Sequence, residues 1–208
     1  QDFWEPLELL LTDYERSPLY VFFDDNQNIY EREKKFPITQ EPFLLTDNCR
    51  NTTQIHSLAY KYYKGDWIEP PNNSGGNIMR IHGDSIELQA KKITMEITNL
   101  ITKEKVSPNS ISILLLNGKS KQNYYNVLEK MPLPKPNKWC IEWIQGESDI
   151  LVDTVMRFKG LESEIVFLWS IDGSESGFLD DLIYVGSSRA KSILYLVGKE
   201  EVCDKIES

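Results

Sequence analysis

The sequence predicts an α/β fold with a doubly wound, mainly parallel sheet that is flanked by helices. Short apolar runs typical of buried strands alternate along the chain with helical patterns in which apolar residues recur every three or four positions. The clearest apolar run, at residues 111–116, is continuous, which is typical of a strand covered on both faces. Strands that alternate with helices in this way predict parallel βαβ units.

Each expected element follows from its local pattern. The expected helices span residues 6–14, 52–63, 86–102 and 123–131. In residues 52–63, for example, Ile55, Leu58, Ala59 and Tyr62 form one apolar face. The expected strands span residues 19–23, 44–45, 78–81, 111–116, 139–143, 150–155, 165–169 and 193–197. A further helix is expected to carry Arg189 into the last of these strands, and residues 69–76, rich in Pro, Asn and Gly, predict a surface loop.

The composition excludes several classes of protein. The net charge of −9 opposes nonspecific nucleic-acid binding, and no apolar run approaches the ~20 residues that a membrane span needs. The odd number of scattered cysteines, 3 in all, argues against a disulfide framework and predicts a reducing, cytoplasmic location. With only 2 histidines the chain has no zinc-ligand spacing, so we expect no metal site. The lack of a long apolar run likewise predicts no membrane partner.

The strongest functional signal is a pair of segments near the C-terminus. Residues 154–162 predict a loop that carries Lys159, Gly160 and Glu162 into a buried strand, and Arg189 precedes another strand. Polar groups at the ends of parallel strands are where open α/β sheets bind ligands. Because the guanidinium is planar and stays charged, Arg189 suits a phosphate.

Two further polar clusters leave alternatives open. Residues 24–27 (Asp-Asp-Asn-Gln) follow an apolar run, and they either hold a metal-bound phosphate and orient a water or form a turn that ends the strand. Arg50 either faces an anion or is a solvated charge, and Asn51 or Thr52 is expected to cap the next helix.

A third cluster, at residues 118–120, has the sequence Gly-Lys-Ser that ends a phosphate-binding P-loop. The complete motif needs a glycine five residues before its Gly-Lys pair, so that backbone amides can surround the phosphate. Ile113, inside a predicted strand, occupies that position. The cluster is therefore excluded as a P-loop.

Taken together and in order, these clusters resemble the later motifs of superfamily 1 DNA helicases of the UvrD/Rep type. Residues 1–3 resemble the end of motif II, 23–30 motif III, 45–51 motif IV, 154–168 motif V and 184–196 motif VI. The resemblance implies RecA-like domains, with residues 1–41 as the tail of the first and residues 42–208 as the second. It also implies ATP and Mg²⁺ as cofactors of the complete protein, and single-stranded DNA and an N-terminal RecA-like domain as partners.

The resemblance implies roles for four residues in ATP hydrolysis. Gln27 would sense the γ-phosphate or align the attacking water, and Gln1 would belong to the water-positioning end of motif II. Arg50 and Arg189 would act as arginine fingers that stabilise charge on the transferred phosphoryl group.

Four other residues are given binding roles by the same resemblance. Glu162 would contact the ribose of the nucleotide, and Gly160 would let the backbone approach it closely. Thr154 and Lys159 would lie nearer the DNA path or relay between the two sites.

The sequence contains neither a P-loop motif nor the Asp-Glu pair of motif II. Because it also begins with Gln1, we expect it to be the C-terminal part of a longer ATP-dependent DNA helicase or translocase. By itself it is expected neither to hydrolyse ATP nor to hold nucleotide tightly. The alternatives are a noncatalytic helicase-fold regulatory or interaction module, which the acidic charge balance favours, and an unrelated α/β binding protein.

Overall fold

The computed structural model describes residues 9–11, 13, 16–23, 40–76, 78–141, 146–169, 171 and 179–207. Gln1, Gln27 and most of the helix expected at residues 6–14 lie outside the described residues.

The core of the molecule is a six-stranded sheet in which every pair of neighbouring strands is parallel. Its strands are β1 (Met79–His82), β2 (Ile111–Leu115), β3 (Lys138–Cys140), β4 (Asp149–Thr154), β5 (Ser163–Trp169) and β6 (Ala190–Gly198). Their order across the sheet is β1-β6-β5-β2-β4-β3. The order places the crossovers on both faces, and the predicted doubly wound α/β fold is confirmed.

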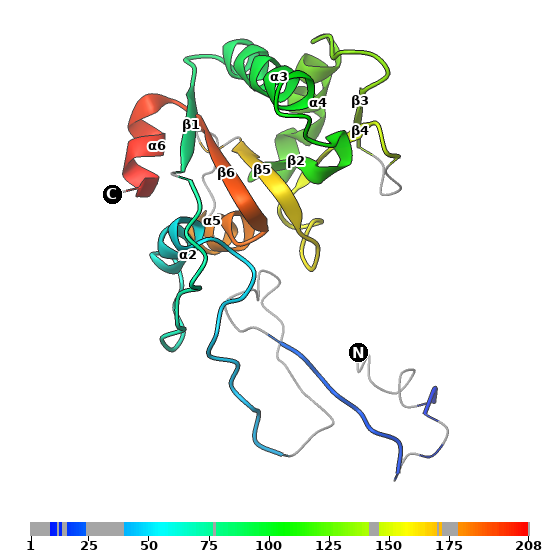
Figure 1. Ribbon diagram of the computed structural model, residues 1–208, viewed down its shortest axis with the longest axis vertical. Coiled ribbons are helices and arrows are strands. Elements are labelled where there is room, and N and C mark those ends of the chain that lie inside the picture. Colours follow the sequence, from blue (N-terminus) through cyan, green and yellow to red (C-terminus); the bar gives the residue numbers. More distant parts are fainter. Residues whose placement is uncertain are drawn as a thin grey trace.

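Helices cover both faces of this sheet (Figure 1). They are α2 (Thr53–Tyr60), α3 (Ile86–Thr102), α4 (Lys121–Glu129), α5 (Leu179–Ser187) and α6 (Glu200–Glu207). Two separate clusters of buried side chains show which helix covers which face: α2, α5 and α6 pack on one, and α3 and α4 on the other. None of the described helices is long and apolar enough to cross a membrane.

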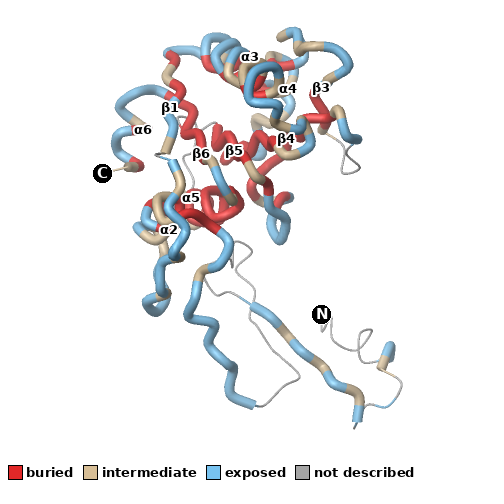
Figure 2. The backbone as a smooth tube through the Cα atoms, viewed as in Figure 1, coloured by how far each residue is buried: buried red, intermediate tan, exposed pale blue. Residues whose placement is uncertain are grey.

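Strand β5 shows how one apolar run serves both clusters. Val166 and Leu168 belong to the cluster with α2, α5 and α6, whereas Phe167 and Trp169 belong to the cluster with α3 and α4. Successive side chains of a strand point to opposite faces, so a strand between two helical layers must be apolar throughout. Figure 2 shows buried strands between helices that are in part exposed, while most of α5 is buried.

The helix before β6 ends earlier than the sequence predicts. Helix α5 stops at Ser187, so Arg189 lies in the turn before β6 and not within the helix. Two serine hydroxyls end the helix by donating to its own carbonyls, Ser187 Oγ to Ile183 O (2.6 Å) and Ser188 Oγ to Val185 O (3.0 Å). The Arg189 carbonyl already accepts from Ser163 N (3.0 Å) at the start of the β5–β6 ladder.

Two expected strands, at residues 19–23 and 44–45, are absent from the sheet. Tyr20, Phe22, Leu44 and Leu45 are 72–83% exposed, so they lack the half-buried surface on which β-rich sequences are stable. Nearby, only a single parallel bridge joins Asp47 to Glu69. Conversely, α6 was not predicted, although its Cys203 and Ile206 are buried at helical spacing.

The assignment of the faces of α3 can be tested by two substitutions on that helix. Ile97 is fully buried, whereas Met95 is 63% exposed. Because Ile97→Ala leaves a cavity in the core, we expect it to lower the free energy of unfolding by about 2–5 kcal/mol. Met95→Ala, as the control, should change it by less than about 0.5 kcal/mol. Urea unfolding measures both, and equal losses would contradict this packing.

Candidate functional site

The structure distributes the predicted site residues between two edges of the sheet. Glu162 precedes β5 and Arg189 precedes β6, and the two strands run parallel with Ser163 opposite Ala190. Glu162 and Arg189 therefore lie together at the amino edge. Thr154 is the last residue of β4 and lies at the opposite, carboxyl edge. Residues 155–162 join the end of β4 to the start of β5 and so run from the carboxyl edge back to the amino edge; we call them the crossover.

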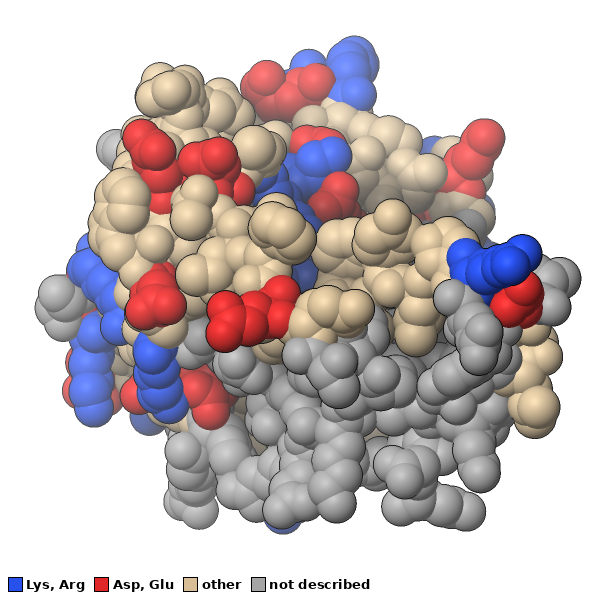
Figure 3. All heavy atoms as spheres, turned by 90° about the horizontal axis from the view of Figure 1, so that it is seen from below, with Lys and Arg blue, Asp and Glu red and all other residues tan. Residues whose placement is uncertain are grey.

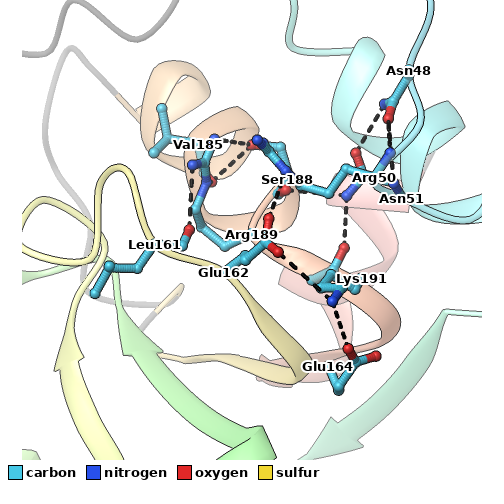
Figure 4. A network of polar contacts seen from close by, with 11 residues as sticks. Asn48, Arg50, Asn51, Leu161, Glu162, Glu164, Val185, Ser188, Arg189 and Lys191 are labelled. Carbon is cyan, nitrogen blue, oxygen red and sulfur yellow. Dashed lines mark hydrogen bonds and ion pairs between the residues drawn. The ribbon is translucent and has the colours of Figure 1, made fainter.

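Arg50 and Glu162, predicted from separate segments, form a direct ion pair. The Arg50 Nε and Glu162 Oε2 atoms are 3.0 Å apart, and the side chains are 44% and 46% exposed (Figure 4). The second carboxylate oxygen of Glu162 lies 3.7 Å from Lys191 Nζ. Exposed ion pairs contribute little to stability, so either partner can exchange for a charged ligand at small cost.

Lys191 is held more closely by Glu164 than by Glu162. Its Nζ lies 2.7 Å from Glu164 Oε1, and Ser192 Oγ donates to the other oxygen at 2.8 Å. The Lys191 ammonium, and then the Ser192 hydroxyl, lower the pKa of Glu164 by hydrogen bonding to its charged form. Lys191 is thus a neighbour of the Arg50–Glu162 pair with a separate partner.

Arg189 is buried and faces inward. It is 2% exposed, and its guanidinium donates to Val185 O (3.1 Å), Leu161 O (3.4 Å) and Ser188 Oγ (3.1 Å). These contacts close the carboxyl end of α5 and attach it to the crossover that precedes β5. In this structure, Arg189 acts as a tie between two segments and is not an outward-facing cation.

Asn51 joins the start of α2 to the turn that carries Arg189. Of the two capping candidates, Thr52 is the cap, because its Oγ1 accepts from Ile55 N at 3.4 Å. The amide of Asn51 instead donates to Ser188 O (3.1 Å) and Ala190 O (2.6 Å), and the residue is only 3% exposed. Arg50 is thereby held next to Arg189.

Two residues of this network, Asn48 and His56, were not predicted as site residues. Asn48 Oδ1 accepts from the backbone N–H of Arg50 (3.0 Å) and of Asn51 (3.2 Å). Its Nδ2 lies 2.9 Å from both Asn51 Oδ1 and His56 Nδ1. Asparagine side chains often accept from the backbone two residues further on, so Asn48 is itself a signal for such a turn. The sequence contains no signal for the histidine contact.

Backbone shape and burial account for two residues of the crossover, Gly160 and Phe158. Gly160 has φ of +88°, a conformation that favours glycine, and a Cβ added there would meet nothing within 4 Å. The backbone conformation, and not crowding by this chain, therefore requires the glycine. Lys159 is exposed, whereas Phe158 is 3% exposed and anchors the crossover in the core.

A buried carboxylate supports the other end of the crossover. Asp153 is fully buried, and its Oδ1 accepts from Lys121 Nζ (2.7 Å) and from Thr154 N (2.7 Å). Thr154 is also buried, and its Oγ1 accepts from Arg157 N at 3.2 Å. The site prediction did not include Asp153, although an aspartate within the apolar run of β4 is a signal, since a buried charge requires a partner.

Charge is mixed around the described surface. In the view from below, acidic and basic side chains are interspersed on the described part of the face (Figure 3). Among the described residues, no group of three or more His, Cys, Asp or Glu side chains gathers in a way that could hold a metal ion. The candidate site itself combines the cations of Arg50 and Lys191 with the carboxylates of Glu162 and Glu164.

Comparisons with known proteins agree with this architecture. Residues 149–197, from β4 to β6, match the family described as UvrD-like helicase C-terminal domain. A solved structure, the C-terminal domain of a possible DNA helicase from Lactobacillus plantarum WCFS1, superposes with a TM-score of 0.56 at 17% identity. The match covers 72% of this chain and 86% of that one, and at this identity it supports the fold alone. A search of curated proteins found no match.

The inward orientation of Arg189 predicts a structural effect of its removal. Arg189→Ala leaves the carbonyls of Val185 and Leu161 without this donor, so we expect the free energy of unfolding to fall by about 1–3 kcal/mol. Lys191→Ala, two positions away and exposed, should leave it nearly unchanged. Chemical denaturation of both variants tests this, and an undiminished stability of Arg189→Ala would contradict the buried contacts.

The burial of His56 predicts an acid-sensitive stability. Burial lowers the pKa of His56 below 6.5, and a hydrogen bond with the Ile68 backbone offsets this in part. The unfolded chain then binds the proton more tightly, so His56 contributes stability above pH 6.5 that is lost as the pH falls through its folded pKa. The denaturation midpoint should therefore decline as the pH is lowered below 6.5, and it should decline less steeply for His56→Asn. Identical pH profiles would contradict a neutral, buried His56.

Proposed function

Because residues 149–197 match the family of UvrD-like helicase C-terminal domains, we propose that the chain supplies half of an ATP site in an ATP-dependent DNA helicase or translocase. The other half comes from a RecA-like domain with a P-loop. The observation that carries the proposal is the meeting of Arg50, Glu162 and Arg189 at one edge of the sheet. Three separate segments thus bring the Arg50–Glu162 ion pair and the turn that carries the buried Arg189 to the same edge.

The chemistry of these groups fits a nucleotide. Arg50 is half-exposed, so its guanidinium can turn from Glu162 toward phosphate oxygens, where it stabilises the charge that develops during phosphoryl transfer. The Glu162 carboxylate, released from Arg50, can accept a hydrogen bond from a ribose hydroxyl. The backbone beside Gly160 is open to an approaching ligand. In this proposal, Mg²⁺ and the phosphate cradle belong to the P-loop domain.

Arg189 requires a rearrangement before it can act as a second arginine finger. Its longest contact is the one to Leu161 O, at 3.4 Å, and the acceptor lies on the crossover. In our proposal, nucleotide binding displaces this part of the crossover and frees one face of the guanidinium. The contact to Val185 O keeps the side chain anchored to α5.

The proposal also gives roles to Lys159 and Thr154 and assigns the two parts of the chain to two domains. Lys159 is exposed on the crossover and contacts the DNA backbone, whereas the buried Thr154 relays movement of the crossover. Residues 1–41, with Gln1 and Gln27, belong to the first RecA-like domain, and residues 42–208 to the second. The exposure of Tyr20 and Phe22 supports this division, because a strand at residues 19–23 would be buried only against the rest of the first domain.

The role of Arg50 is tested in the protein that joins this chain to its P-loop domain. We expect Arg50→Ala to lower kcat for DNA-stimulated ATP hydrolysis by about 10³-fold or more, as for other arginine fingers. Lys191→Ala is the matched control, because Lys191 also lies beside Glu162 but is held by Glu164. Steady-state kinetics measure both variants.

One observation favours the second candidate, a noncatalytic module that keeps the fold as an interaction surface. Both arginines are paired within this chain, Arg50 with Glu162 and Arg189 with backbone carbonyls. A structural role for both pairs predicts that Arg50→Ala retains normal turnover. The same kinetic comparison therefore separates the two candidates.

A further inference from the structure

Arg50 is held in position by a chain of hydrogen bonds that runs through Asn48 and ends at His56. The turn before α2 is closed by the side chain of Asn48, whose Oδ1 accepts from the backbone of both Arg50 and Asn51. The direction in which Arg50 leaves the backbone therefore depends on how the Asn48 amide is oriented.

The orientation of that amide is set by its nitrogen. An amide nitrogen has two N–H groups, and those of Asn48 are directed to Asn51 Oδ1 and to His56 Nδ1, both at 2.9 Å. Because this nitrogen can only donate, His56 Nδ1 must accept with a lone pair. The contact thus requires a neutral imidazole whose proton is on Nε2.

His56 is well suited to remain neutral and fixed. It lies in the first turn of α2, is 5% exposed and stacks on Tyr60 with ring centroids 3.9 Å apart. Burial disfavours its charged form, in agreement with the lowered pKa. The ring therefore offers Asn48 a lone pair in a constant place.

Asn51 fixes the same turn from its other side. Its amide nitrogen donates to the carbonyls of Ser188 and Ala190, which flank Arg189. The backbone of Arg50 is thus held on one side by Asn48 and on the other by a residue tied to β6. Its side chain remains half-exposed and reaches Glu162.

We propose that His56 is a positioning residue for Arg50: its imidazole accepts from Asn48, and Asn48 holds the turn that aims the Arg50 guanidinium. The inference rests on the proposed function, in which Arg50 stabilises the transferred phosphoryl group. Without His56, one Asn48 N–H loses its acceptor, and the amide can rotate away from the turn. Because catalytic rates are sensitive to misplacement by an ångström, kcat should fall by about 10- to 100-fold.

The decisive experiment is a double-mutant cycle in the protein that joins this chain to its P-loop domain. His56→Leu should lower kcat for DNA-stimulated ATP hydrolysis while the KM for ATP changes by less than about 3-fold. His56→Asn should restore most of the rate, because an amide oxygen at the δ position can accept in place of Nδ1. Ser57→Ala, an exposed substitution on the same helix, should leave kcat unchanged.

The cycle with Arg50→Ala separates positioning from a general structural defect. If His56 acts through Arg50, His56→Leu should change kcat by less than about 2-fold in the Arg50→Ala background. The same loss in both backgrounds, or no loss in either, would overturn the inference. Normal turnover of Arg50→Ala alone would instead overturn the proposed function.

A measurement on the 208-residue chain tests the hydrogen bond without any activity. Long-range ¹H–¹⁵N correlation spectra should show His56 as the Nε2–H tautomer at neutral pH. Asn48→Asp replaces the donor by a carboxylate, so it should raise the pKa of His56 and move the proton to Nδ1. An Nδ1–H tautomer in the unsubstituted chain, or an unchanged His56 in Asn48→Asp, would overturn the inference. Because these spectra do not require His56→Leu, they test the inference even if that variant fails to fold.

Discussion

The arrangement of the site depends on the side-chain amide of Asn51. It reaches across the chain to two backbone carbonyls, those of Ser188 and Ala190, at the place where α5 turns into β6. Each such bond contributes roughly 0.5–1.5 kcal/mol, and a buried carbonyl left unpaired costs more. Because Asn51 is almost fully buried, no water replaces it readily. This contact connects the turn that carries Arg50 to the turn that carries Arg189.

The elements that sequence predicts well are those whose apolar pattern matches their burial. The helix expected at residues 86–102 has the bounds of α3, because Ile93 and Ile97 are buried at helical spacing. The run at 111–116 includes β2, because every residue of that strand is buried between two helical layers. Residues 19–23 have the same β-rich composition but are exposed, since composition does not reveal whether a neighbouring strand is present. Periodicity thus predicts which residues can be buried, and the rest of the chain decides whether they are.

The sequence predicts which residues belong to the candidate site better than it predicts the contacts that they make. Arg50, Glu162 and Arg189 were singled out from their motifs, and the structure brings them to one edge, while their roles stay predictions. The inward orientation of Arg189 could not be predicted, because its acceptors are backbone carbonyls that any sequence would provide. His56 was missed for a related reason. A hydrogen bond between Asn48 and a histidine one helical turn into α2 depends on the shape of the turn, which is set by contacts more than a hundred residues away.

The crossover between β4 and β5 offers a physical link between the two edges of the sheet. At the carboxyl edge it begins beside Thr154, and at the amino edge it ends with Leu161, an acceptor of Arg189, and Glu162, the partner of Arg50. Between these ends, Val155 and Phe158 are buried in the same core cluster as Ile183 and Val185 of α5. The packing is direct, since a Cβ added at Gly186 of α5 would stand 3.0 Å from Val155 Cγ2.

Close-packed cores transmit displacement, because they have little free volume in which to absorb it. A shift of the crossover at the Thr154 end must therefore move α5 or the Leu161 end, and either movement alters the contacts of Arg189. In the proposed function, this is how contact with DNA near one edge reaches the nucleotide-facing arginines at the other.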